Sequence, residues 1–179
     1  INAGVRAEGL TYSKFINDES NSTYLIFSDA ASAININFHN DFSMLSYNFG
    51  TAGIKTAALN FGGNLDPGGR TGKTESYDGS TWTEVADLND TRYGNDGAGT
   101  YTAAIAMGGN APGFTGNTET WDGSSWTEVA NLNLGRSRLA SAGLVTAAIA
   151  MGGRTPSVTA DAETWNGSSW TEVADMNTA

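Results

Sequence analysis

The chain of 179 residues carries 19 Asp and Glu but only 9 Lys and Arg, a formal net charge of −10 at pH 7 that disfavours nucleic-acid binding. Cysteine is absent and His39 is the single histidine, which excludes disulfides, thiolate sites and a multi-histidine metal site. No apolar run approaches the roughly 20 residues of a membrane helix. With 39% hydrophobic and 16% charged residues, we expect an acidic, folded, all-β protein without cofactor, metal or membrane insertion.

The first 45 residues are predicted to form a small N-terminal β module. Residues 24–27 and 33–38 are expected to be strands, because the second segment alternates Ile and Phe with Asn. The polar residues 14–22 are predicted to be a loop. This module has too little core to stand alone, so we expect it to dock onto the rest of the chain or onto a partner subunit. The first residue is Ile1 rather than Met, which favours a processed chain or part of a longer one.

Residues 46–179 contain three copies of one unit. The segment TAALNFGG, or its variant TAAIAMGG, begins at Thr56, Thr102 and Thr146. The segment WTEVA recurs with a period of 44 residues, at Trp82, Trp126 and Trp170. An Ala-Gly pair precedes every TAA segment, and the first copy is longer by two residues around Pro67. We assign the copies to residues 46–90, 91–134 and 135–179.

Each copy has the pattern of four short strands. In the second copy they are GNDGAGTY, TAAIAMGG, NTETW and WTEVA, separated by turn residues. The TAAIAMGG segment places Ile105 and Met107 on one face and small alanines on the other, which predicts a strand covered on both faces. The Asp-Gly-Ser sequence before WTEVA is typical of a tight hairpin. The pattern therefore favours a four-stranded antiparallel blade every 44 residues.

These residues resemble the kelch repeat, in which a diglycine ends an apolar strand and an aromatic residue and a Trp follow. The diglycines are Gly62 and Gly63, Gly108 and Gly109, and Gly152 and Gly153. The aromatic residue and the Trp are Tyr77 and Trp82, Trp121 and Trp126, and Trp165 and Trp170. Arg92 and Arg136 stand where kelch repeats often carry an Arg. The resemblance implies β-propeller blades, although the spacing of five between the aromatic residue and the Trp is shorter than usual.

The copies have nearly identical sequences, such as GSSWTEVA and TAAIAMGG. In this they are similar to repeats of phage tail-fibre and virion-appendage proteins. Three copies are too few to close a propeller. A degenerate fourth blade in the first 45 residues, a longer array, or oligomerisation would each complete it. We favour the last two, because open end blades expose apolar faces and strand edges.

The hairpin register predicts opposed aromatic pairs in every copy. It sets Tyr77 opposite Trp82, Trp121 opposite Trp126, and Trp165 opposite Trp170, and such pairs stabilise a sheet. Core packing between blades is the favoured interpretation of Trp82, Trp126 and Trp170. A sugar-stacking platform is the alternative, for which the candidate ligand-binding residues beside the turn are Tyr77, Trp121 and Trp165.

The same register opposes two glutamates in every copy, namely Glu75 and Glu84, Glu119 and Glu128, and Glu163 and Glu172. Like charges that face each other destabilise a sheet. We expect a bulge to break the pairing, or one Glu of each pair to bind backbone amides or an Arg, with Arg92 and Arg136 as candidates. Bound Ca²⁺ is the alternative, although no Asp-rich calcium loop is present. A glycosidase also uses two carboxylates, but recurrence in every copy favours a structural role.

The sequence favours a non-enzymatic structural and receptor-recognition protein of a phage tail fibre or virion appendage. Its repeated loops, residues 64–73, 110–117 and 154–161, would give multivalent binding to a host-surface glycan. The expected partners are copies of the chain or other virion subunits, and the expected location is the virion or the extracellular space. A secreted or cell-surface adhesin or lectin is the second hypothesis, and a glycan-cleaving enzyme is the third.

Overall fold

The structure is a computed structural model that describes residues 3–7, 10–18, 21–24, 26–27, 33–34, 45–66 and 69–177. Side chains are described for residues 48–65 and 69–177. Every regular element in these ranges is a β-strand, which confirms the predicted all-β class. Among the described segments there is no helix of the length and apolarity needed to span a membrane.

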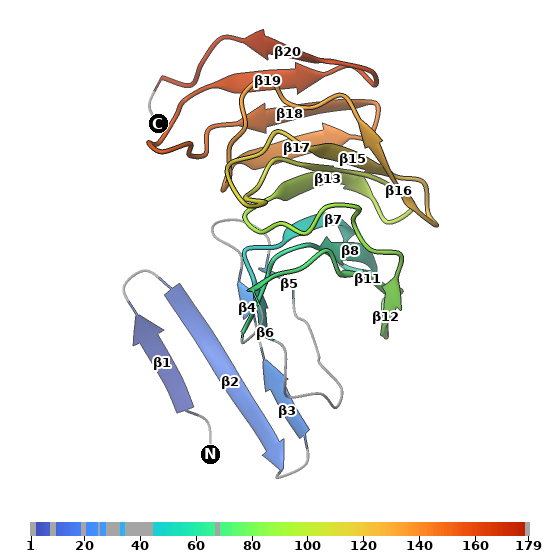
Figure 1. Ribbon diagram of the computed structural model, residues 1–179. Coiled ribbons are helices and arrows are strands. Elements are labelled where there is room, and N and C mark those ends of the chain that lie inside the picture. Colours follow the sequence, from blue (N-terminus) through green and yellow to red (C-terminus); the bar gives the residue numbers. More distant parts are fainter. Residues whose placement is uncertain are drawn as a thin grey trace.

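Three four-stranded antiparallel sheets, called here the first, second and third repeat sheets, dominate the structure (Figure 1). The first consists of β7 (Gly50–Ile54), β8 (Ala57–Phe61), β11 (Thr74–Tyr77) and β12 (Trp82–Val85). The second consists of β13 (Asp96–Thr100), β14 (Ala103–Met107), β15 (Thr118–Trp121) and β16 (Trp126–Val129). The third consists of β17 (Ala140–Leu144), β18 (Ala147–Met151), β19 (Ala162–Trp165) and β20 (Trp170–Val173). In each, the strands follow one another in chain order from one edge to the other, as predicted for the repeats.

The Ala-Gly pair before each TAA segment is explained by the hairpin between the first two strands. Gly53, Gly99 and Gly143 all have φ between +109° and +121°, a region that residues with a Cβ atom rarely adopt. A Cβ atom on Gly99 would collide with the carbonyl oxygen of Ala103 on the opposite strand. Glycine therefore allows the two strands to approach closely just before the turn.

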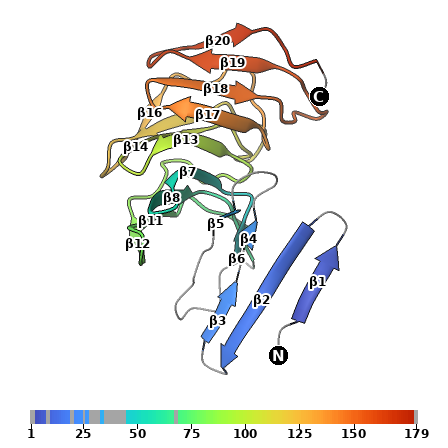
Figure 2. The same cartoon turned by 180° about the vertical axis from the view of Figure 1, so that it is seen from behind.

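The first strands of the three sheets lie side by side, β7 beside β13 and β13 beside β17 (Figures 1 and 2). Just before these strands, Asn48, Gly94 and Arg138 adopt left-handed φ angles of 57°, 66° and 55°. The Gly94 N–H donates to Asn48 O and the Arg138 N–H donates to Gly94 O, both at 2.6 Å. This chain of backbone hydrogen bonds links each repeat sheet to the next at the same position.

Two hydrophobic cores lie between consecutive sheets. Between the first and second, Leu59 and Phe61 pack against the face of the second sheet that carries Ala104 and Ala106. Between the second and third, Ile105 and Met107 occupy the equivalent places, opposite the alanines of β18. The prediction that β14 is covered on both faces is therefore confirmed. Alanine on one side makes room for the large side chains of the neighbouring sheet, which allows tight packing.

The described parts of the N-terminal segment are also strands. A three-stranded antiparallel sheet contains β1 (Ala3–Ala7), β2 (Leu10–Asp18) and β3 (Asn21–Tyr24), and β4 (Ile26–Phe27) pairs with β5 (Ala33–Ile34). The loop predicted for residues 14–22 is therefore wrong, because most of them lie in β2 and β3. Polar composition alone does not exclude a strand, because antiparallel sheets accommodate polar side chains. Residues 35–38 of the second predicted strand lie outside the described residues.

The longer loop of the first copy contains a hairpin. Within residues 64–73, β9 (Asn64–Asp66) pairs with both β10 (Gly69–Arg70) and β6 (Leu45–Tyr47). β6, β9 and β10 thus form a small three-stranded sheet at the place of the predicted loop, whose residues 67–68 lie outside the described residues. In the sequence, β6 precedes the hairpin of β7 and β8, and β9 follows it. The pairing of β6 with β9 therefore connects the start of the first copy to its loop.

Candidate recognition surface

The predicted aromatic pairs are present, and two of the three are in the core. Trp121 opposes Trp126 and Trp165 opposes Trp170, with ring centroids 5.4 Å apart in each pair. Trp121 and Trp165 are only 3% exposed, and their Nε1–H groups donate to Tyr101 O and Val145 O. Their burial leaves no ring face for a sugar and corrects the prediction of a stacking platform at these two positions. Trp126 and Trp170 are buried, as predicted.

The first pair differs from the other two. Tyr77 and Trp82 oppose each other, and their rings stack at a centroid distance of 5.0 Å. Both are half-buried, and Trp82 Nε1 has no hydrogen-bond partner among the described residues. In the second sheet, by contrast, Trp126 Nε1 donates to Thr74 Oγ1 of the preceding sheet at 3.1 Å. Of the predicted aromatic ligand-binding residues, Tyr77 alone keeps a partly exposed ring.

The opposed glutamates have unequal surroundings. Glu119 faces Glu128 and Glu163 faces Glu172, as the register predicted. Glu119 and Glu163 are each 1% exposed, whereas their counterparts across the strands are exposed. The buried glutamates are paired with fully buried arginines, Arg92 at 3.0 Å and Arg136 at 2.6 Å. The predicted Arg pairing is therefore confirmed in the second and third repeat sheets.

Backbone and amide donors complete the surroundings of the buried glutamates. Glu119 Oε2 accepts the N–H and the side-chain Nδ2–H of Asn89, both at 2.8 Å. Asn133 donates to Glu163 in the same manner, at 2.7 and 2.8 Å. Both asparagines lie in the segment that connects one repeat sheet to the next. The glutamates thus hold these connectors in place, which is a structural role.

The first repeat sheet lacks this arrangement. Ser46 occupies the sequence position of Arg92 and Arg136, and half-buried Glu75 faces Glu84. Burial, and then the charge of Glu84, raise the pKa of Glu75. Lys73 partly relieves the repulsion, because its Nζ lies 3.0 Å from Glu84 Oε2; this hydrogen bond raises the pKa of Lys73. Among the described residues, no group of three or more His, Cys, Asp and Glu could hold a metal ion.

The diglycines and the hairpin turns lie at opposite ends of the repeat sheets. All six glycines of the diglycines have positive φ. A Cβ atom on Gly108 would lie 2.6 Å from Arg136 O, and the Gly109 N–H donates to the same oxygen at 2.8 Å. The diglycines therefore anchor the loops after β8 and β14 on the connectors to the next sheet, through Gly63 N–H to Arg92 O and Gly109 N–H to Arg136 O. We call this end of the repeat sheets the loop face.

At the other end, an Asx-type turn closes each pair of outer strands. Asp122 Oδ1 accepts the N–H groups of Ser124 and Ser125, each at 2.8 Å. Asn166 Oδ1 accepts from Ser168 and Ser169 in the third sheet. The hydrogen bond from the Ser124 hydroxyl, together with the two backbone N–H groups, lowers the pKa of Asp122 to about 2. These exposed turns are the same whether an Asp or an Asn accepts the bonds.

We expect the Asp122 turn to weaken in acid. Its folded pKa of about 2 lies below the unfolded value of ~3.9, so its contribution to stability is present above pH ~3.9 and is lost as the pH falls toward 2. Amide NMR shifts of Ser124 and Ser125 should follow this titration between pH 5 and 1.5, whereas those of the Asn166 turn should not. Asp122→Asn is the matched control and should remove the titration. A carboxyl that titrates near pH 4 would contradict the hydrogen-bonded turn.

The variable loops form a regular pattern on the loop face. In the second copy, Tyr93 pairs with Asn110, and Asn110 pairs with Phe114. The third copy repeats this with Ser137, Arg154 and Val158. In the first copy the equivalent residues, Tyr47, Asn64 and Arg70, belong to the pairs of β6, β9 and β10. The loop face therefore carries three parallel rows of three residues, and we call these the loop rows.

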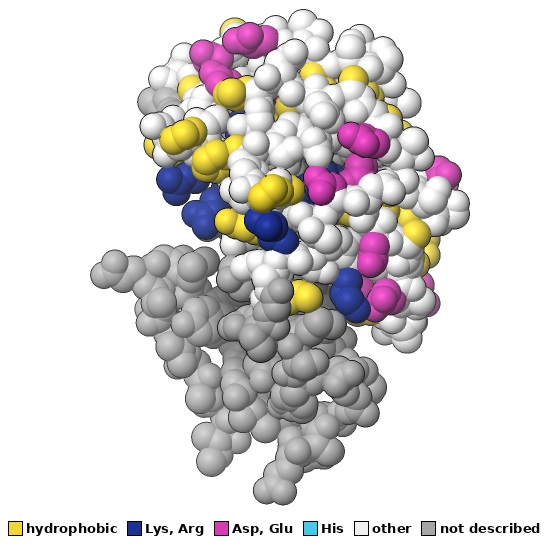
Figure 3. Space-filling model, in the orientation of Figure 1, with side chains coloured by type: hydrophobic (Ala, Val, Ile, Leu, Met, Phe, Trp, Pro, Cys, Tyr) yellow, Lys and Arg dark blue, Asp and Glu magenta, His cyan; other side chains and the backbone are white. Residues whose placement is uncertain are grey.

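Several side chains of the loop rows are exposed. Phe114 is 38% and Val158 is 73% exposed, and Arg70 and Arg154 are exposed as well. Beside the third row, exposed Arg138 follows Ser137 directly. In Figure 3, Lys and Arg side chains lie beside hydrophobic side chains on the side toward which β18 runs. Most acidic side chains of that view lie elsewhere.

The variable loops were predictable from the sequence, whereas the connector residues beside them were not predicted. Residues 110–117 and 154–161 were proposed as the variable surface, and the structure brings them to one face. Tyr93 and Arg138 belong to the connectors, whose role was recognised only for the buried arginines. Differences between the copies could have indicated these residues. One position of the repeat holds Tyr47, Tyr93 and Ser137, and the next holds Asn48, Gly94 and Arg138. No family model matches the chain, and no curated protein matches it either.

Proposed function

We propose that the chain is a non-enzymatic recognition protein whose repeat sheets present the loop rows to a ligand. One observation carries this proposal: the most variable residues of all three copies lie together on one face, while the framework beneath them is nearly identical. The loops are held by backbone hydrogen bonds, such as Thr115 N–H to Gly109 O and Thr159 N–H to Gly153 O, both at 3.0 Å. Such bonds do not depend on the side chains, which are therefore free to vary for binding.

The burial of Glu119 and Glu163 disfavours a glycosidase function. A general acid or nucleophile must reach substrate, but Glu119 and Glu163 are enclosed, each paired with a buried arginine and bonded to Asn donors. The opposite glutamates are exposed on a flat strand. Because the arrangement is the same in the second and third repeat sheets and holds the connectors in place, it is explained without catalysis.

The proposed context follows from the resemblance of the repeats to kelch repeats and to those of phage tail-fibre and virion-appendage proteins. Consecutive sheets whose first strands lie side by side are compatible with blades of an incomplete propeller. On this basis we propose a virion appendage with multivalent, glycan-type receptor binding. A secreted or cell-surface adhesin with the same architecture is the second candidate.

We also propose that the third repeat sheet is covered in the assembled protein. Ala98 and Leu132 are buried between the second and third sheets, whereas their equivalents on the third sheet, Ala142 and Met176, are exposed. Ile149 and Met151 are half-buried, although their equivalents in β14 are fully buried. Figure 1 shows β17–β20 at one end of the stack, and among the described residues no sheet lies against their outer face. A second copy of the chain is the proposed partner for this apolar face.

A loop exchange tests the recognition proposal. Residues 110–117 and 154–161 are equally long, so the third copy's loop can replace the second copy's loop without a change of length. We expect the thermal midpoint to stay within a few degrees while the pattern of ligands on a glycan array changes. Asp122→Asn, at the opposite end, is the control that should leave the pattern unchanged. An exchanged loop with an unaltered pattern, or a wild-type chain that binds no glycan, would overturn the proposal.

A further inference from the structure

We infer that the loop face binds an anionic, carboxylate-bearing saccharide through Arg138 and Arg154, with Arg70 as a further contact. This inference rests on the proposed function and names the ligand class of the same surface. It depends on the distribution of positive charge, on the backbone of Arg138 and on the neighbours of Arg154.

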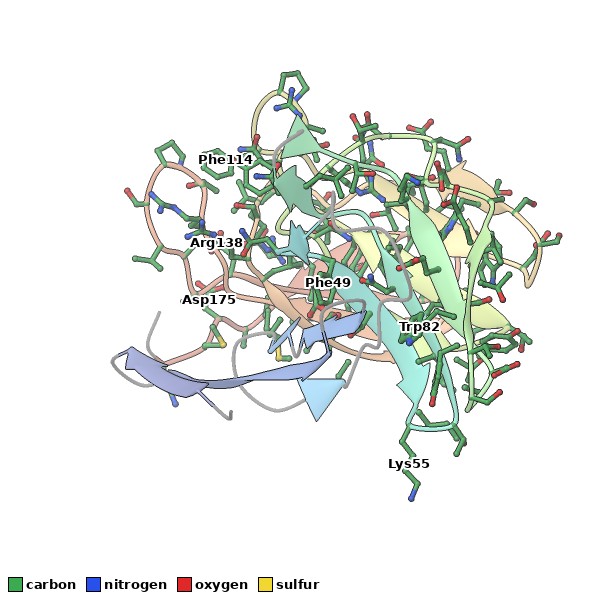
Figure 4. The ribbon with its side chains drawn as sticks, turned by 90° about the horizontal axis from the view of Figure 1, so that it is seen from below. Phe49, Lys55, Trp82, Phe114, Arg138 and Asp175 are labelled. Atoms are coloured by element: carbon green, nitrogen blue, oxygen red, sulfur yellow. The ribbon has the colours of Figure 1, made fainter. Side chains whose placement is uncertain are left out.

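Positive charge without an acidic partner is concentrated on the loop face, where Arg154 Nη2 donates only to Pro156 O of its own loop, at 3.4 Å. Of the cations whose side chains are described, Arg92 and Arg136 are buried in ion pairs and Lys73 pairs with Glu84. Arg70, Arg138 and Arg154 are exposed and form no ion pair with any described residue. Lys55 is exposed as well, but it projects from the opposite end of the first repeat sheet (Figure 4). In a chain of net charge −10, three arginines without an acidic partner on one face favour the binding of an anion there.

The arginines and the acidic residues of this end lie on different parts of it. The described acidic side chains near the loop face include Asp87, Asp90, Asp161 and Asp175, which belong to the connectors or end a loop, and Asp96 at the start of β13. Three of them are engaged, since Asp87 accepts the Thr74 N–H, Asp90 accepts Asn117 Nδ2–H and Asp96 accepts the Ser141 hydroxyl. None belongs to the second or third loop row. The rows therefore combine guanidinium groups with uncharged side chains.

Arg138 has a backbone conformation that arginine rarely adopts. Its φ is +55°, and the equivalent positions are Gly94 and Asn48, the residue types that tolerate this region best. Its side chain is exposed and fills no core, so packing does not explain why an Arg stands there. An exposed Arg in a backbone conformation that disfavours it points to a use of its side chain. The bond from its N–H to Gly94 O holds the residue at the start of the third row.

Arg154 lies next to Arg138 and beside apolar groups. The Ser137 N–H donates to Arg154 O at 2.9 Å and the Arg154 N–H donates to Ser137 O at 2.8 Å, so the residue after Ser137 is adjacent to Arg154. Val158 pairs with Arg154 in the same row, and Phe114 ends the neighbouring row. Guanidinium groups bind carboxylates in a bidentate manner, and apolar side chains suit the C–H face of a sugar ring. The half-buried Asn110 amide adds a hydrogen-bond donor and acceptor for hydroxyl groups.

Titration with two uncomplicated probes tests this inference. A galacturonic-acid hexamer should bind wild-type protein, and the uncharged glucose hexamer should bind at least about tenfold more weakly, as the loss of one charged hydrogen bond implies. Binding of the acidic hexamer should weaken when salt rises from 20 to 200 mM, since exposed charges are then screened. Arg154→Gln and Arg138→Gly should each weaken it by about tenfold or more.

Arg138→Gly separates binding from folding. It places at position 138 the residue that the second copy already carries, so we expect the thermal midpoint to rise or to stay unchanged while affinity falls. A merely structural role would lower both. Lys55→Gln removes a positive charge from the opposite end and should leave affinity unchanged, which excludes an effect of net charge.

The outcomes distinguish this inference from the proposed function. If the acidic hexamer does not bind, but the loop exchange changes the binding of neutral glycans, the inference is wrong and the recognition function stands. Equal affinity for both hexamers, or arginine variants that bind normally, would also overturn the inference alone. A hexaglutamate peptide that binds as well as the acidic hexamer would show that the surface selects carboxylates but not saccharides.

Discussion

Glu119→Gln should lower the free energy of unfolding by about 3–5 kcal/mol, because it leaves the Arg92 guanidinium buried without its carboxylate. The variant also weakens the two charge-assisted bonds from Asn89, which hold the connector between the first and second repeat sheets. Glu128→Gln, on the exposed side of the same strand pair, should change stability by less than about 0.5 kcal/mol. Chemical denaturation followed by Trp fluorescence measures both.

The same pair of variants separates a scaffold from an enzyme. A scaffold loses stability with Glu119→Gln and has no turnover to lose, whereas a glycosidase would lose turnover in both variants while remaining folded. The double variant Arg92→Met with Glu119→Leu should recover part of the loss, since it removes both buried charges together. Equal, small effects of Glu119→Gln and Glu128→Gln would contradict the buried ion pair.

Ile105→Ala should destabilise the chain by about 2–5 kcal/mol, because Ile105 is fully buried between the second and third sheets. Ile149 occupies the same position of the repeat on the third sheet, where it is half-buried. In an isolated chain, Ile149→Ala should therefore cost less, about 1.5 kcal/mol or below. The two variants differ only in whether a further sheet lies against the isoleucine.

This comparison also reports on assembly. If a second copy covers the third sheet, the Ile149→Ala variant should dissociate at concentrations at which wild-type protein remains associated, and light scattering measures the change in mass. Ile105→Ala is the control, since its site is internal to the chain and should leave the mass unchanged at temperatures at which it remains folded. A wild-type chain that is monomeric at all concentrations would exclude the second copy as the partner.

The repeat sheets were predictable because their signals are local and occur three times. The Asp-Gly-Ser turn determines which residues oppose each other, and every predicted aromatic and glutamate pair has the observed register. The two apolar faces of TAAIAMGG correctly implied a neighbour on each side of β14, whereas β18 is covered by a described sheet on one side only. The pairing of Arg92 and Arg136 with the buried glutamates followed from the electrostatic problem that the register creates.

The burial of Trp121 and Trp165 was not predictable from their position beside the turn. Proximity to an exposed turn says little about a side chain's exposure, because exposure depends on which face of the sheet meets the next one. The loop rows were missed for a related reason. They arise from isolated backbone pairs between a connector and a loop, such as Tyr93 with Asn110, and such pairs join segments that are distant in sequence and share no pattern. Repetition reveals a framework more readily than it reveals contacts between its variable parts.

The hydrogen bonds from Gly94 to Asn48 and from Arg138 to Gly94 connect the sheets through main-chain atoms alone. A unit inserted after the second copy would find the same donor and acceptor on either side, whatever its side chains. Evolution can therefore lengthen or shorten the protein by whole modules without redesigning a junction, and each new module contributes another line of contacts to the exposed surface. Gene duplication then determines how many such lines of contacts the surface has, and point mutation determines the chemistry of each.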